Sequence, residues 1–132
     1  MRRTLTAAAL STALLVTGAP LATSAAARGG GDDRVIRTGS CSGSADWKLK
    51  TKTDDGRLEV EWEVDSNRSG QTWRVRIRDN GVLVVKTRAT TGGRSGSFSI
   101  ERKIANRAGS DVIVARSRNL ASGQLCVGRL TF

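Results

Sequence analysis

The stretch from Asp46 to Asp79 decides the fold, and it reads DWKLKTKTDDGRLEVEWEVDSNRSGQTWRVRIRD. In three consecutive segments, apolar side chains alternate with charged ones. The charged positions are lysines in 46–52, glutamates in 58–64 and arginines in 73–78. A period of two is the pattern of β-strands that bury one face and expose the other. The stretch therefore predicts three strands whose exposed faces carry different charges.

Turn-forming residues separate these strands and set the predicted pairing. A four-residue loop at 53–56 joins the first two strands, and a three-residue loop at 79–81 with Gly81 in the left-handed region joins the third strand to a fourth. These loops predict that Leu83 lies opposite Ile77 and that Val85 lies opposite Val75. In the first hairpin the predicted pairs are Trp47 with Trp62, Leu49 with Val60, Lys50 with Glu59 and Lys48 with Glu61.

The rest of the chain continues the same pattern. Phe98 and Ile100 mark a fifth strand, residues 111–117 a sixth, and the segment after the loop 119–122 a seventh, in which Cys126 is predicted opposite Ala115. The segment 90–96 is predicted to be a mobile loop and 103–110 a turn region. No segment has the periodicity of an amphipathic helix. Seven short strands separated by turns predict an all-β, two-sheet antiparallel sandwich.

The N-terminal residues have the features of a targeting segment. Arg2 and Arg3 precede an apolar run over 5–16, and the small residues at 25–27 suit a signal peptidase. The run is too short to span a membrane. We expect residues 1–27 to be a cleaved signal peptide, 28–40 a flexible Gly-rich leader with at most a minor strand at Val35–Ile36, and 41–132 the folded domain. The mature protein is predicted to be secreted and extracellular, and its oligomeric state is left open.

The two cysteines predict one disulfide. Cys41 and Cys126 are the only cysteines of the chain, and an exported protein meets an oxidising environment. The bond would close a loop of 86 residues and stabilise the domain by about 4–5 kcal/mol in the chain-entropy model. A metal-ligand or reactive-thiol role is disfavoured because no histidine is present and no second cysteine lies near either one.

The strand pattern resembles that of immunoglobulin-like and fibronectin type III domains over nearly the whole mature chain. The resemblance is carried by L-x-V-x-W at 58–62, W-x-V-x-I at 73–77 and I-V-A-x-S-x-N-x-x-x-G at 113–123. The chain lacks the tyrosine corner and the usual inter-sheet cysteine pair of those domains. The leader and the Arg- and Gly-rich composition also resemble those of small secreted proteins of actinobacteria. The resemblance implies that the first, second and fifth strands form one sheet and the other four strands form the second.

This division predicts a segregation of charge. The chain has 22 basic and 12 acidic residues, and removal of Arg2 and Arg3 leaves a formal charge of +8. Lysines and glutamates would neutralise each other on the first sheet. The second sheet would present a basic face and, with it, an apolar patch of Val82, Val84, Val112, Val114, Leu125 and Val127. The predicted basic face consists of Arg74, Arg76, Arg78, Lys86, Arg88, Arg116, Arg118 and Arg129.

A basic and apolar sheet face favours a secreted, non-catalytic binding or adhesion module. Its expected partners are anionic cell-wall or extracellular polymers, or an acidic protein. Sequence-specific nucleic-acid recognition is disfavoured, because the three tryptophans are predicted inside and no helix is available for a groove. Two alternatives compete with this prediction. In the first, the arginines of the basic face only reflect an arginine-rich composition and have no function. In the second, the second and third strands pair directly, so that Glu59, Glu61 and Glu63 neutralise Arg78, Arg76 and Arg74.

The sequence offers little for catalysis or metal binding, so we expect no enzyme, no cofactor and no metal. The absence of histidine excludes Ser–His and Cys–His arrangements. Residues 65–70 (DSNRSG) match the first half of a calcium loop, but the twelfth position is Arg76, and a turn explains the same residues. The alternative function is inhibition of a secreted protease or hydrolase by the loop 90–96, with Arg94 presented to a trypsin-like pocket.

Overall fold

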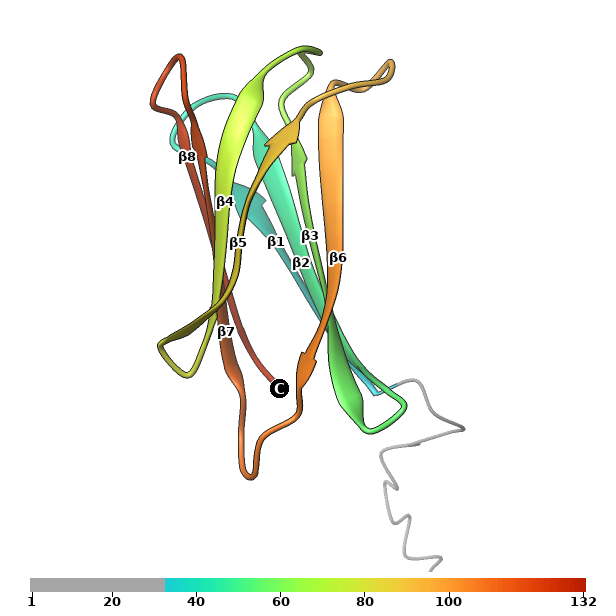
Figure 1. Ribbon diagram of the computed structural model, residues 1–132. Coiled ribbons are helices and arrows are strands. Elements are labelled where there is room, and N and C mark those ends of the chain that lie inside the picture. Colours follow the sequence, from blue (N-terminus) through green and yellow to red (C-terminus); the bar gives the residue numbers. More distant parts are fainter. Residues whose placement is uncertain (1–32) are drawn as a thin grey trace, which may run out of the picture.

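The computed structural model describes residues 33–132, which form eight strands in two antiparallel sheets packed face to face (Figure 1). One sheet has the order β1-β2-β3-β6 and the other has the order β5-β4-β7-β8. Within residues 33–132 there is no helix long and apolar enough to cross a bilayer. The strands are β1 (Arg34–Ser40), β2 (Asp46–Asp54), β3 (Arg57–Asp65), β4 (Thr72–Asp79), β5 (Val82–Thr90), β6 (Ser97–Ala105), β7 (Val112–Asn119) and β8 (Leu125–Thr131).

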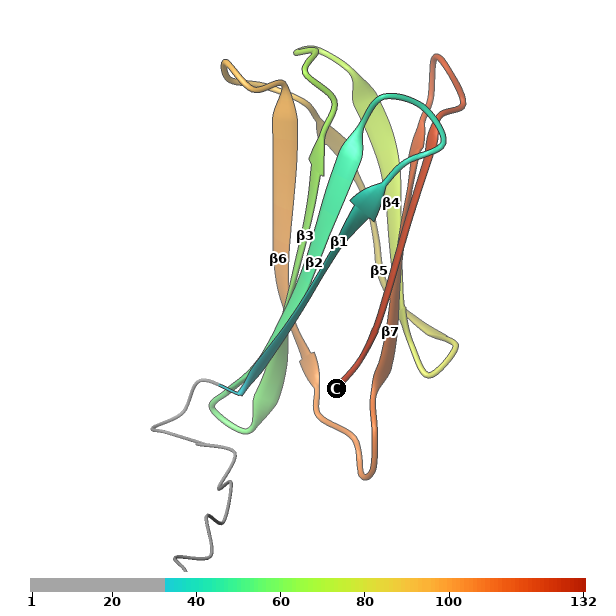
Figure 2. The same cartoon turned by 180° about the vertical axis from the view of Figure 1, so that it is seen from behind.

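The predicted division of the strands between the sheets is confirmed. The alternative in which the glutamate and arginine strands pair is wrong, because β3 pairs with β2 and β6 while β4 pairs with β5 and β7. The flexible leader predicted over 28–40 is wrong for its second half. Residues 34–40 form β1, which pairs with β2 along its whole length (Figure 2). The predicted signal peptide lies outside the described residues.

The register of the first hairpin differs from the prediction by two residues. Asp55 and Gly56 form a two-residue turn with φ of 48° and 74°, where a four-residue loop was predicted. Asp-Gly favours this type I′ geometry, which matches the twist of the strands. Trp47 therefore lies opposite Val64, and Lys50 opposite Glu61. A shift of two keeps every side chain on its predicted face.

The second hairpin also has a two-residue turn, with positive φ at Asn80 and Gly81, and a bulge follows it. The bulge places Val85 opposite Ile77, where Leu83 was predicted. Leu83 lies on the outer face and is 43% exposed. Between β7 and β8 the register is again shifted by two, so that Gly128 lies opposite Ala115.

The core is built around a stacked tryptophan pair. The rings of Trp47 and Trp62 lie 5.5 Å apart between centroids. A Cβ on Gly128 of the opposite sheet would lie 2.6 Å from the Trp62 ring and 2.8 Å from that of Trp47, so only glycine fits there. Trp62 also donates a buried hydrogen bond of 2.6 Å from Nε1 to Ser117 Oγ, which links β3 to β7 across the sandwich. These contacts fix how the two sheets face each other.

The predicted disulfide between Cys41 and Cys126 is present. Cys41 directly follows β1, and Cys126 lies in β8. The bond therefore joins the edge strand of one sheet to the edge strand of the other.

A cationic sheet face as the candidate binding site

The outer face of the β5-β4-β7-β8 sheet carries two rows of three cations. Arg74 lies opposite both Arg88 and Arg118. In the next row, Arg76 lies opposite both Lys86 and Arg116. Neighbouring strands lie about 4.8 Å apart and alternate residues about 7 Å, so the six charges share a patch on the order of 10 Å by 7 Å. We call these six residues the cationic grid.

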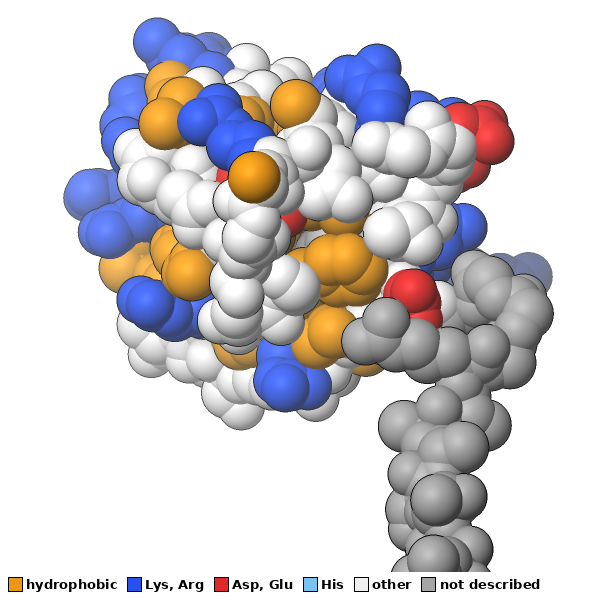
Figure 3. All heavy atoms as spheres, turned by 90° about the horizontal axis from the view of Figure 1, so that it is seen from below, with side chains coloured by type: hydrophobic (Ala, Val, Ile, Leu, Met, Phe, Trp, Pro, Cys, Tyr) orange, Lys and Arg blue, Asp and Glu red, His pale blue; other side chains and the backbone are white. Residues whose placement is uncertain are grey.

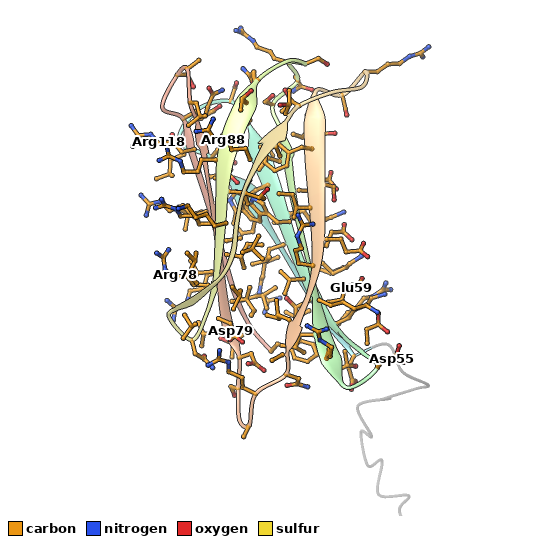
Figure 4. All side chains as sticks on the ribbon, viewed as in Figure 1. Asp55, Glu59, Arg78, Asp79, Arg88 and Arg118 are labelled. Carbon is orange, nitrogen blue, oxygen red and sulfur yellow. A yellow bond between two sulfur atoms is a disulfide. The ribbon has the colours of Figure 1, made fainter. Side chains whose placement is uncertain are left out.

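The other two predicted residues extend the same face. Arg78 lies opposite Val114, and Arg129 lies opposite Val114 from the other side. All eight predicted residues therefore point to the outside of one sheet, and Figure 4 shows three of them, Arg78, Arg88 and Arg118, on the side away from Glu59.

No carboxylate of the described chain neutralises these cations. None of the eight forms an ion pair with another residue of 33–132, and the acidic side chains of the sheet's strands do not lie on this face. The Nε of Arg76 is shielded from solvent and has no acceptor among the described atoms. Like charges directly opposite each other in a sheet repel and destabilise it. The grid thus concentrates repulsion at its central strand.

The opposite sheet shows the contrasting arrangement. Lys50 Nζ lies 2.6 Å from Glu61 Oε2, and the hydrogen bond from Lys50 lowers the pKa of Glu61. Lys48 lies 3.2 Å from Glu63, which raises the pKa of Lys48. Further pairs join Lys52 to Glu59 at 3.3 Å and Lys103 to Asp54 at 2.9 Å. The lysines of β2 and the glutamates of β3 are thus neutralised within the fold, as predicted.

Two shallow depressions flank the arginines of β4. One, of 320 Å³, is lined only by Arg74, Arg76, Arg78, Arg116 and Arg118. The other, of 420 Å³, is lined by Arg74, Arg76, Lys86, Thr87 and Arg88. Arg74 and Arg76 form the ridge between them. An anion in either depression would meet cations on both sides.

The apolar patch predicted beside the cations is smaller than expected. Val82 and Val127 are exposed, at 45% and 43%, but the other four predicted members are half-buried. Leu83 joins the face because of the bulge. In Figure 3, which looks onto the lower end of the sandwich, apolar side chains lie between basic ones along the flank of this sheet.

Two buried carboxyl groups, which the sequence pattern did not single out, lie at the lower end of the sandwich. Asp79 and Asp111 are 0% and 1% exposed, and both oxygens of Asp79 lack a hydrogen-bond donor. Burial, and then the neighbouring carboxyl group of Asp111, raise the pKa of Asp79, while Arg107 at 3.9 Å opposes the rise. Extending the alternation of 73, 75 and 77 by one step would have placed Asp79 inside (Figure 4). Such enclosed groups act on stability, because no substrate reaches them.

The calcium-like segment 65–70 and the loop 90–96 contact each other at the opposite end of the sandwich. Asp65 accepts a hydrogen bond from the backbone N–H of Asn67, so the calcium-like segment forms a local turn that crosses between the sheets. Within residues 33–132 no cluster of three or more acidic, Cys or His side chains is placed to hold a metal ion. The loop 90–96 is fixed to this segment by hydrogen bonds from Ser66 N to Gly96 O and from Ser69 Oγ to Gly93 O. It is therefore better held than the predicted mobile loop, and its Arg94 is exposed.

Comparison with known proteins adds no assignment to this geometry: no protein-family model and no curated protein matches the sequence.

Proposed function

We propose that this protein is a non-catalytic binding module that holds anionic polymers on its basic face. The observation that carries the proposal is the cationic grid, in which each of Arg74 and Arg76 has a cation directly opposite on both neighbouring strands. Repulsion in such an array disfavours the folded state, and a bound polyanion would relieve it.

The arrangement of charge within the sandwich supports this proposal over a purely compositional origin. A chain that was only rich in arginine would distribute its cations over both sheets. Here the lysines of β2 each contact a carboxylate, whereas the eight cations of the basic face contact none within residues 33–132. Arg37, Arg57 and Arg102 of the other sheet also form no ion pair within residues 33–132, so the distinguishing feature of the basic face is that its cations lie side by side with no carboxylate among them.

We also propose that the sandwich is a divergent immunoglobulin-like or fibronectin type III-like domain that works outside the cell. The order β2-β3-β6 and β5-β4-β7-β8 is the division that the sequence resemblance implied, with β1 added at one edge. The disulfide is compatible with an oxidising compartment. Cell-wall and other extracellular polymers are then the partners within reach.

The test is binding of residues 28–132 to bacterial cell wall, heparin and DNA across a salt series. With about six phosphate or sulfate contacts, affinity should fall on the order of a thousandfold between 50 and 200 mM salt. The double variant Arg74→Glu/Arg76→Glu should lose most of the binding. The matched control is Arg94→Glu/Arg102→Glu, which changes the net charge equally but lies off the basic face.

The control makes the test decisive. A loss of binding in the first variant alone locates the contact surface on the β5-β4-β7 strands. Equal loss in both variants would show that only net charge matters. Binding that ignores salt and both variants would refute the electrostatic mechanism.

A second candidate function is inhibition of a secreted protease, favoured by the bracing of the loop 90–96. A Cβ on Gly96 would lie 2.2 Å from the backbone nitrogen of Arg68, so the two loops are in close contact and hold Arg94 outward. A rigid loop loses less entropy on binding than a mobile one. Incubation with trypsin-like secreted proteases tests the idea, and rapid cleavage after Arg94 without inhibition would exclude it.

A further inference from the structure

We infer that the basic face recognises tetrahedral oxyanions, namely the phosphate or sulfate groups of a polymer, in preference to carboxylates. The inference rests on the proposed function and narrows it to a ligand class. The first observation is that lysines and arginines are placed differently on the two sheets. Four of its five lysines, Lys48, Lys50, Lys52 and Lys103, contact carboxylates on the opposite sheet. On the basic face, seven of the eight cations are arginines.

This difference matters because the two side chains bind anions differently. An ammonium group is a compact point charge, whereas a guanidinium presents a planar fork of donors that matches two oxygens of one anion. A surface that needed only positive charge would serve equally well with lysine. The fork is of use where a ligand offers several oxygens to each arginine.

The depressions beside β4 add the geometric argument. The one between β4 and β7 is lined by five arginines and no other residue, so forks approach it from two strands. A carboxylate is planar, and its two oxygens match one fork approaching in that plane. A sulfate monoester has three free oxygens in a pyramid, and an internal phosphate has two on a tetrahedral centre whose acceptor directions are not confined to one plane, so either group can accept hydrogen bonds from arginines on both walls. The site therefore fits the tetrahedral group better.

The second depression indicates a repeating ligand. It shares the ridge of Arg74 and Arg76 with the first and has its own cations, Lys86 and Arg88. Two oxyanions on neighbouring units of one chain would occupy the two depressions together. No exposed aromatic ring lies on this face in the described chain, since Trp62 and Trp73 are fully buried, so stacking on nucleobases is not part of the recognition.

The experiment compares three polymers: inorganic polyphosphate, heparin and hyaluronate, which carries carboxylates only. The variant replaces the four arginines of β4 and β7 in the grid by lysine: Arg74→Lys, Arg76→Lys, Arg116→Lys and Arg118→Lys. It keeps the charge and removes the forks. The control is Arg94→Lys/Arg102→Lys. Titration calorimetry at fixed low salt measures the affinity of the native protein and of the variant for each polymer. The ratio of the two affinities for the same polymer cancels differences in charge density between polymers. Circular dichroism verifies that the variant is folded.

We expect the lysine variant to bind polyphosphate or heparin at least about tenfold more weakly than the native protein, with little change for hyaluronate and none in the control. A loss seen with polyphosphate alone or heparin alone supports the inference and identifies phosphate or sulfate as the source. If the lysine variant binds every polymer as tightly as the native protein, the inference is overturned while the proposed function stands. If the native protein binds no polymer at low salt, both fail.

Discussion

The cationic grid predicts that removing a charge from its centre stabilises the protein. Arg76 has Lys86 opposite on one side and Arg116 opposite on the other. Its Nε makes no hydrogen bond that a substitution would break. In Arg76→Glu, two repulsive cross-strand pairs become two attractive ones. Each pair loses a repulsion and gains an attraction of about 0.2–1 kcal/mol, so we expect the free energy of unfolding to rise by about 1–4 kcal/mol.

The assay is urea and thermal unfolding of the native protein and the variant at low ionic strength. For a domain of about 100 residues, each 1 kcal/mol corresponds to about 4–8 °C in Tm. The matched control is Arg94→Glu, which changes the net charge equally and has no cation opposite it in a sheet. Its effect should stay within about 0.5 kcal/mol.

Salt provides the internal check on this prediction. Screening lengths fall from about 10 Å at 0.1 M to about 3 Å at 1 M, so the gain from Arg76→Glu should shrink strongly in 1 M salt. A gain that persists in 1 M salt would have to come from packing or propensity. If Arg76→Glu is neutral or destabilising at low salt, or matches Arg94→Glu, the repulsion inferred from the grid is wrong.

Three further predictions test the core, the buried acids and the disulfide. Gly128→Ala should lower the free energy of unfolding by about 1–3 kcal/mol because its Cβ enters the tryptophan pair, whereas Gly92→Ala, which has open space around it, should leave urea unfolding unchanged. Because the folded-state pKa of Asp79 is raised, the native protein loses stability as pH rises through that pKa. Asp79→Asn should therefore be more stable by about 1–3 kcal/mol at pH 7, with the gain vanishing near pH 3, and a pH-independent difference would contradict the assignment. The double variant Cys41→Ala/Cys126→Ala should lose about 4–5 kcal/mol in denaturant unfolding, and a change below 1 kcal/mol would refute the loop-entropy account.

Strand identity could be predicted from the sequence, because alternation determines which side chains are buried, whereas the division of the strands between the sheets came from the resemblance to immunoglobulin-like domains. Leu58, Val60, Trp62 and Val64 are all fully buried, as their period of two requires. The arginines of the basic face followed from the same alternation, since every second residue from Arg74 to Arg78 of β4 is an arginine. The basic face also depended on the predicted division of the strands, because direct pairing of the glutamate and arginine strands would have neutralised it.

Register was harder to predict, because the charges of the first hairpin repeat. A row of three lysines opposite a row of three glutamates gives favourable pairs in the observed register and in one shifted by two residues. Only the turn distinguishes them, and the Asp55–Gly56 pair, with positive φ at both residues, selects the two-residue loop. The bulge after Ile77 has no comparable local signal, so the exposure of Leu83 could not be read from the pattern.

The substitution Arg76→Glu also distinguishes a surface that binds a ligand from one whose arginines only reflect the composition of the chain. If the arginines are compositional, Arg76→Glu raises stability and alters nothing else. If the face binds a polyanion, stability and affinity move in opposite directions on the same substitution, and salt weakens both effects. A ligand that binds only the folded state stabilises it by an amount that grows with the logarithm of the ligand concentration divided by Kd. Because the native protein would bind the polymer more tightly, added polymer should raise its Tm more than that of the variant. With saturating polymer, the advantage of Arg76→Glu in Tm should therefore shrink or reverse, which packing alone would not produce. The shift should exceed that of Arg94→Glu, which changes the net charge equally.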